Sequence, residues 1–135
     1  MLGKREPAIY GSVSFDDYLK NLKSKFSELE IEYFQSNCEG EIIDKIQELG
    51  FKRPECKGII INPGAYAHYS YAIADALASI KTPVVEVHIS NIYKREEFRH
   101  CSVTAPNCIG VITGLGLESY SLALRYLLTN SKIKN

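Results

Sequence analysis

Two of the chain's three histidines stand directly after apolar runs, among residues that could carry out acid–base chemistry. His68 closes the segment INPGAYAH, which also contains Asn62, and His88 follows Glu86 by two positions in the segment EVHISN. An imidazole gives and takes protons near neutral pH, a carboxylate can orient it, and an amide can hold a hydroxyl or carboxylate group. This mixture suits the binding of a polyhydroxy compound and its dehydration better than it suits a packed core.

The spacing of Glu86 and His88 predicts a working pair. Residues two apart in a strand face the same side of the sheet, so the carboxylate can orient the imidazole and make a usable acid. A glutamate within the apolar run VVEV is costly to bury unless it has a function. The alternative interpretation is that His88 is a hydrogen-bonded residue at the end of a strand, and that Glu86 is a partly buried charge held by a lysine.

Other candidate residues have simpler alternatives. His68 and Asp75 are two helical turns apart in a predicted helix, so they could share one face, with His68 kept neutral by the positive end of the helix dipole. They could equally be ordinary surface residues. By spacing alone, Arg95 and Arg99 surround two glutamates as an ion-paired helical turn would.

The N-terminal segment 1–13 is predicted to be a loop that closes over a site as a lid, because it contains Pro7, flanking glycines and no periodic pattern. Tyrosine is a poor base at its ordinary pKa of about 10, but an arginine beside it favours the phenolate. Arg5 and Tyr10 could form such a pair. Alternatively, Tyr10 only docks the loop.

Strand and helix patterns alternate along the chain and predict an α/β fold with a doubly wound parallel sheet, covered by helices on both faces. Ligands in such folds bind beyond the carboxyl ends of the strands, which places Asn62 and His88 at one edge. The predicted strands are 30–35, 58–62, 83–88 and 109–113. The predicted helices are 14–29, 40–49 with Gly50 as a left-handed cap, 67–80, and one that follows Gly116 with Leu117, Tyr120, Leu124 and Leu127 facing inward.

The composition limits the class of protein. A chain of 135 residues that is 45% hydrophobic is the right size for a single domain spanning 1–135. Sixteen basic and sixteen acidic residues cancel, which argues against nucleic-acid binding. The four cysteines show no CxxC spacing, and no signal peptide or long apolar run is visible, so we expect a cytoplasmic protein that does not enter a membrane.

Four segments together resemble the type II 3-dehydroquinate dehydratases: KREPAIYGS, INPGAYAHYSYAIADAL, VEVHISNIYKREEFRHCS and GVITGLGLESYSLALRYL. The resemblance covers nearly the whole chain, and the combination of NPGAYAH, EVHISN and REEFRH is highly specific. It implies a flavodoxin-like fold and the shikimate-pathway conversion of 3-dehydroquinate to 3-dehydroshikimate and water. It also implies a reaction without metal, Schiff base or other cofactor.

The resemblance further implies a role for each candidate residue. Tyr10 is the base, Arg5 promotes its ionised form and supports the enolate, His88 protonates the departing hydroxyl, and Glu86 orients His88. Asp75 reaches the site of a neighbouring subunit in a homododecamer built as a tetramer of trimers. Substrate contacts are implied for Asn62, His68, Arg95, Arg99 and the backbone of Ile89 and Ser90.

One departure from the family concerns the N-terminus. Members usually begin with a further strand that ends in Gly-Pro-Asn-Leu-Asn before the Leu-Gly seen here as Leu2-Gly3, and this chain begins at Met1. We expect either that the natural protein is longer or that its catalysis is impaired. The alternative function is a non-catalytic paralogue that binds a polyhydroxy acid or only assembles. A flavodoxin-like nucleotide binder is a more remote alternative, because GLGLES lacks the spacing and the lysine of a phosphate loop.

Overall fold

The computed structural model describes residues 15–92 and 101–130. The chain divides into two units, Met1–Gln35 and Ser36–Asn135, and each is described by itself. In the first unit, helix α3 (Phe15–Lys25) has acidic residues in its first turn and basic residues in its last, which complements the helix dipole. Leu22 and Phe26 are buried at the predicted four-residue spacing. The helix ends at Lys25, earlier than Leu29, because the chain then continues as a turn.

The prediction of a strand at residues 30–35 is wrong. These residues follow α3 without regular secondary structure. An extended segment becomes a strand only when it exchanges hydrogen bonds with a neighbour, and no strand in the described ranges pairs with this one. Tyr33 packs its ring against Phe15 instead, with 4.9 Å between the ring centroids.

The second unit is built on a parallel sheet in the order β1-β2-β3. The strands are β1 (Ile59–Ile61), β2 (Val84–His88) and β3 (Gly110–Thr113), in agreement with three of the predicted strands. β2 is the central strand and is buried over its whole length, which explains its run of β-branched residues. The α/β class and the parallel sheet are therefore confirmed.

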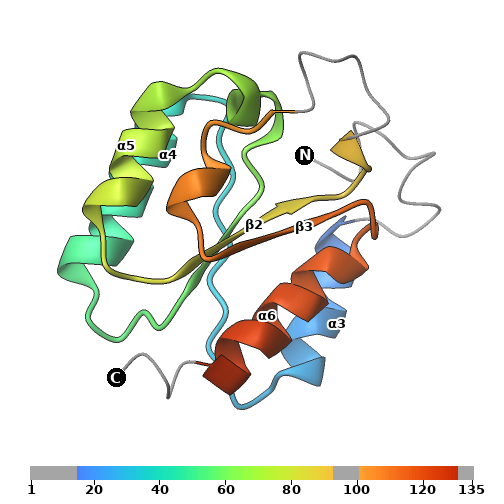
Figure 1. Ribbon diagram of the computed structural model, residues 1–135. Coiled ribbons are helices and arrows are strands. Elements are labelled where there is room, and N and C mark those ends of the chain that lie inside the picture. The colour runs from blue at the N-terminus through green and yellow to red at the C-terminus, as the bar shows by residue number, and fades with distance from the viewer. Residues whose placement is uncertain (1–14, 93–100, 131–135) are drawn as a thin grey trace. The chain divides into compact units, whose positions relative to one another are not determined.

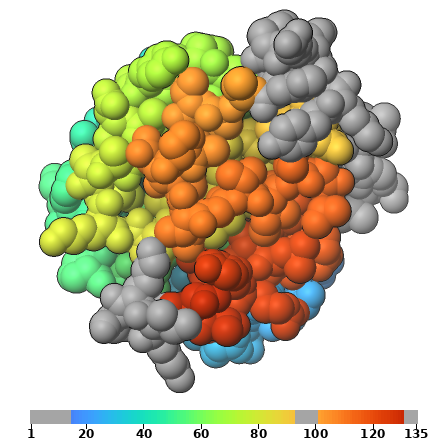
Figure 2. Space-filling model, in the orientation of Figure 1, coloured from blue at the N-terminus to red at the C-terminus, as the bar shows by residue number. Residues whose placement is uncertain are grey.

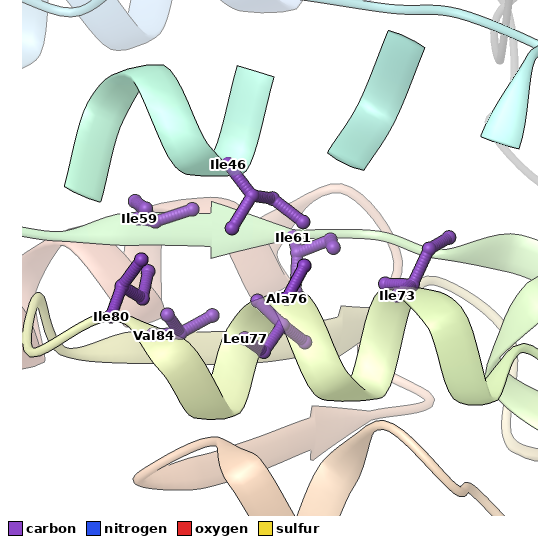
Figure 3. Close-up of a cluster of buried hydrophobic side chains, with 8 residues drawn as sticks. All are labelled: Ile46, Ile59, Ile61, Ile73, Ala76, Leu77, Ile80 and Val84. Carbon is purple, nitrogen blue, oxygen red and sulfur yellow. The ribbon is translucent and has the colours of Figure 1, made fainter. Parts of the chain in front are cut away.

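Helices cover both faces of this sheet (Figure 1). Helices α4 (Glu39–Gln47) and α5 (Tyr71–Ser79) lie on one face, and α6 (Glu118–Asn130) lies on the other. Figure 3 shows the core between the strands and the first pair of helices, formed by Ile46, Ile59, Ile61, Ile73, Ala76, Leu77, Ile80 and Val84. A second cluster joins α6 to the sheet through Val85, Val87, Ala123 and Leu127. The sheet is doubly wound, as predicted.

The α6 face agrees only partly with the predicted inward residues. Leu127 is buried and Tyr120 packs against the second cluster, but Ala123 is the most buried residue of that cluster on the helix. Leu117 and Leu124 are half-buried. A small alanine at the centre of the contact lets the helix approach the sheet closely.

Helix α5 begins later than predicted, at Tyr71 instead of Ala67. Ser70 caps the helix by accepting a hydrogen bond from the N–H of Ile73 at 3.1 Å, a role for which serine is well suited. The preceding residues, Gly64–His68, form a separate 3-10 helix, and Gly64 has a positive φ of 59°. His68 is therefore placed by the 3-10 helix and not by the first turn of α5.

The predicted left-handed cap at Gly50 is also wrong. After α4 the chain continues as a π-helical turn, Glu48–Lys52, and Gly50 does not have a positive φ. The reason for glycine is space: a Cβ at position 50 would lie 2.2 Å from Cγ2 and 2.6 Å from Cβ of Ile80. Glycine is required here because the π-helical turn after α4 comes very close to Ile80 at the end of α5.

This contact makes a testable prediction about stability. Gly50→Ala should lower the free energy of unfolding by about 1–3 kcal/mol, because the added methyl group overpacks the core against Ile80. Urea unfolding of both proteins measures the change. Gly40→Ala is the matched control, since a Cβ at position 40 meets nothing within 4 Å and the site is helical, so it should be neutral or stabilising. Equal losses in the two variants would contradict the packing explanation.

Candidate active site

The carboxyl ends of the three strands meet at one edge of the sheet. His88 ends β2 and pairs in register with Thr113, the last residue of β3, while Asn62 directly follows β1. The turn after β2 is held by β3 and the following loop: Gly116 donates its N–H to the carbonyl of Ile89 at 2.9 Å, and the Thr113 hydroxyl donates to the carbonyl of Ser90 at 3.2 Å. The structure thus places Asn62, His88, Ile89 and Ser90 at the edge where the sequence predicts a site.

Glu86 and His88 form a buried pair on β2. Oε2 of Glu86 lies 2.6 Å from Nε2 of His88, and the two residues are 0% and 3% exposed. With Glu86 ionised, Nε2 of His88 carries a hydrogen and donates it to the carboxylate. The other ring nitrogen, Nδ1, has no hydrogen-bond partner among the described residues. The predicted same-side arrangement is present. The alternative in which a lysine holds Glu86 does not apply among the described residues, where its partners are His88 and two hydroxyl groups.

Ser102 and Thr104 are the partners that sequence reasoning missed. The Ser102 hydroxyl donates to Oε2 of Glu86 at 2.8 Å, and the Thr104 hydroxyl donates to Oε1. Burial alone would raise the pKa of Glu86, but hydrogen bonds from His88, Thr104 and Ser102 outweigh burial and lower the pKa below its ordinary value. The local sequence feature that could have indicated these residues is a pair of hydroxyl side chains ahead of a turn, in SVTAP. This pattern does not predict which group the hydroxyls bind.

Asn62 is fixed in orientation by contacts at both ends of its amide. Its Oδ1 accepts a hydrogen bond from the N–H of Gly64 at 3.1 Å, and its Nδ2 donates to the hydroxyl oxygen of Tyr120 in α6 at 3.0 Å. These contacts define which side of the amide is the donor, and the second hydrogen on Nδ2 stays available to a bound molecule.

His68 and Asp75 do not share a helical face, so that prediction is wrong. His68 belongs to the 3-10 helix before α5, while Asp75 lies on the exposed side of α5. Nδ1 of His68 is 2.8 Å from the carbonyl oxygen of Cys101, so Nδ1 carries the hydrogen that it donates. Nε2 of His68 is buried and has no hydrogen-bond partner in the described part of the chain. Within the described ranges, this nitrogen is therefore an acceptor without a donor.

Four predicted site residues, Arg5, Tyr10, Arg95 and Arg99, lie outside the described residues, as does the predicted lid segment. Within the described ranges, no group of three histidine, cysteine, aspartate or glutamate residues is arranged to hold a metal ion. No helix in these ranges combines the length and apolar character needed to span a membrane.

The Cys108 thiol contacts this region and should be unreactive. Burial raises its pKa to about 12, and the negative charge of Glu86 adds to this effect. Iodoacetamide at neutral pH is expected to alkylate the exposed Cys38 and Cys101 and to leave Cys108 unmodified until the protein is unfolded. Peptide mass spectrometry over time measures the rates. Modification of Cys108 at the rate of Cys38 would contradict the assigned burial and charge.

The fold and the site define an α/β protein with an acid–base pair at the carboxyl edge of a doubly wound sheet. The sequence model of dehydroquinase class II matches residues 1–128. Proteins named 3-dehydroquinate dehydratase match closely: that of Caldicellulosiruptor bescii is 59% identical over 126 residues, which cover 92% of this chain and 86% of that protein. The corresponding protein of Lachnoclostridium phytofermentans is 61% identical over 125 residues, covering 91% and 85%.

Solved structures agree with the sequence comparison. The crystal structure of the type II dehydroquinase from Butyrivibrio crossotus superposes with a TM-score of 0.84 at 53% identity, covering 94% of this chain and 88% of that one. The chain belongs to the dehydroquinase class II family. The resemblance and the flavodoxin-like fold expected from the sequence are thereby confirmed.

Proposed function

We propose that this chain is a type II 3-dehydroquinate dehydratase that converts 3-dehydroquinate to 3-dehydroshikimate and water in the shikimate pathway. The observation that carries the proposal is the buried Glu86–His88 pair at the carboxyl edge of the sheet, in a chain whose family match spans residues 1–128. A cytoplasmic location, expected from the cysteine spacing, is part of the proposal.

The elimination runs through an enolate in this proposal. The Tyr10 phenolate removes the proton next to the ketone, with Arg5 stabilising the phenolate and the enolate. His88 then donates a proton to the departing hydroxyl, which leaves as water while the double bond forms. Because Nε2 of His88 faces Glu86, Nδ1 is the nitrogen that delivers this proton. A general acid and a general base in separate positions each contribute about 10²- to 10⁴-fold when well placed.

The remaining site residues bind the substrate. Asn62 offers the free hydrogen on Nδ2 to a hydroxyl group, and Nε2 of His68 accepts from another polar group. The backbone of Ile89 and Ser90 holds the carboxylate, and Arg95 and Arg99 complete the lid and substrate contacts.

We further propose that the chain assembles as a homododecamer, a tetramer of trimers, in which Asp75 reaches the site of a neighbour. Exposed apolar side chains support self-association: β3, the loop after it and α6 present Val111, Leu115, Leu122 and Tyr126. Sedimentation equilibrium should give a molar mass twelve times that of one chain. A monomer would contradict the proposed assembly and would leave the proposed reaction unaffected.

The test of the reaction is an ultraviolet assay of enone formation from 3-dehydroquinate. A rise in absorbance that depends on the protein is expected. If calorimetry shows that 3-dehydroquinate binds while no enone forms, the non-catalytic paralogue replaces the dehydratase.

Tyr10→Phe tests the assigned base. The variant loses the phenol oxygen and keeps the ring, so turnover is expected to fall by about 10²-fold or more while the affinity measured by calorimetry changes little. Unchanged turnover in this variant would remove Tyr10 from the mechanism.

A further inference from the structure

Glu86 is a carboxylate with no exposed surface at the centre of the sheet. An ionised carboxylate is stable there only when hydrogen bonds replace the water that it has lost. Both of its oxygens have donors: Oε2 accepts from His88 and Ser102, and Oε1 accepts from Thr104. The pair on β2 is therefore completed by two hydroxyl groups from a distant part of the chain.

The two hydroxyls are oriented as donors toward Glu86. Their oxygens lie 3.0 Å apart, but each hydroxyl has a single hydrogen, and both hydrogens are used by the carboxylate. The Ser102 oxygen in turn accepts the N–H of Ala105 at 3.1 Å, which leaves its own hydrogen free to point at Glu86.

The segment that carries these hydroxyls is held in place by hydrogen bonds to Ala67 and to α5. The N–H of Val103 donates to the carbonyl of Ala67 at 2.6 Å, and the side chain of Asn107 donates to the carbonyl of Ala74 in α5 at 2.9 Å. In Figure 2 the orange segment that leads into β3 lies next to the yellow-green α5 on the face in view. Thr104 itself is 0% exposed. Donors fixed in this way need no rearrangement when charge develops nearby.

We propose that Ser102 and Thr104 are positioning residues that keep the shared proton of the Glu86–His88 pair on the imidazole and off the carboxylate. The proposal rests on the proposed function, in which His88 is the acid. One proton can sit on either group of the pair. The two hydroxyl donors stabilise the carboxylate form of Glu86, so they favour the ion pair in which His88 is an imidazolium. The shared proton then stays on Nε2, and the imidazolium can deliver its other proton, on Nδ1, to the leaving hydroxyl.

The other groups around Glu86 that belong to described residues do not compete for this proton. Its register partners on the neighbouring strands, Ile61 and Val111, are apolar. The Cys108 thiol stays neutral, with a pKa raised to about 12. On the helices that cover this face, Asp75 is exposed and Glu39 is engaged by the hydroxyl of Ser70. Among the described residues, His88 is the ionisable side chain that is hydrogen-bonded to Glu86.

The kinetic test uses Thr104→Val, which removes the hydroxyl and preserves the side-chain shape. Its kcat should fall by about tenfold, with KM nearly unchanged, because Thr104 has no exposed surface for a substrate to contact and His88 is less often the imidazolium acid. Thr104→Ser should restore kcat, and Thr129→Val, on the exposed side of α6, should leave kcat unchanged. In a Glu86→Gln background the same Thr104→Val change should add little, since the carboxylate on which it acts is gone.

A spectroscopic test separates this inference from the proposed function, because it needs no turnover. At mildly acidic pH, infrared spectra of the wild-type protein should lack the C=O band of a protonated buried carboxyl group. That band should appear in Thr104→Val or in Ser102→Ala and be absent from the corresponding Glu86→Gln double variants. Two variants are used so that one remains if the other fails to fold. If the band appears in neither variant and kcat is unchanged, the inference is overturned. If the wild-type protein shows no turnover, only the proposed function is overturned.

Discussion

Replacing His88 by alanine is expected to lower kcat for the dehydration of 3-dehydroquinate by about 10²- to 10⁴-fold, the contribution of a well-placed general acid. The leaving hydroxyl must take a proton as it departs, and His88 is the group at the end of β2 whose second nitrogen, Nδ1, is not used by a described residue. The affinity for 3-dehydroquinate, measured by calorimetry, should change far less than kcat, because proton donation matters only in the transition state.

A second variant separates chemistry from folding. His88→Ala also deprives Glu86 of a donor in a fully buried position, so part of the loss could come from local rearrangement. His88→Gln keeps an N–H group that can donate to Glu86 but cannot act as an acid near neutral pH. It should retain the thermal stability of the wild type more closely and still lose turnover. Wild-type turnover in His88→Gln would exclude His88 as the acid, and Ser79→Ala serves as the control for a surface substitution.

The sequence was sufficient for the features that depend on local pattern. The β-branched runs identified β1, β2 and β3, and the two-residue spacing of Glu86 and His88 predicted that their side chains meet. The location of the strands and the contact between these two side chains both follow from the geometry of a single strand. Parallel pairing then brings Asn62 to the same edge without any further information, since the carboxyl ends of parallel strands coincide.

The features that were missed depend on partners remote in the chain. The hydroxyls of Ser102 and Thr104 act on Glu86 from beyond a long connection, and glycine at position 50 is set by Ile80. Residues 30–35 have a strand-like sequence, but a strand also needs a neighbour with which to pair. Local sequence propensity does not predict any of these contacts, because they depend on tertiary structure.

Glu86→Ala should cause the largest loss of stability, about 3–5 kcal/mol in the free energy of unfolding. The substitution leaves three donors without their acceptor, those of the buried His88 and Thr104 and the half-buried Ser102, and also opens a cavity at the centre of the sheet. Urea unfolding at a fixed protein concentration measures the change. Glu28→Gln, on an exposed residue, is the matched control and should stay within about 0.5 kcal/mol of the wild type.

The pH dependence of stability provides a sharper test through Glu86→Gln, which preserves shape and removes the charge. The pKa of Glu86 is lower in the folded protein than in the unfolded chain, so the unfolded state binds protons first as the pH falls. The stability that the carboxylate contributes is therefore complete above its ordinary pKa and is lost as the pH falls through the lowered pKa of the folded state. The wild type should exceed Glu86→Gln in stability at neutral pH, and this difference should shrink steadily on acidification. A difference that is constant from neutral to acidic pH would mean that Glu86 does not gain its stability as a carboxylate, and the hydroxyl contacts from Ser102 and Thr104 would then need another explanation.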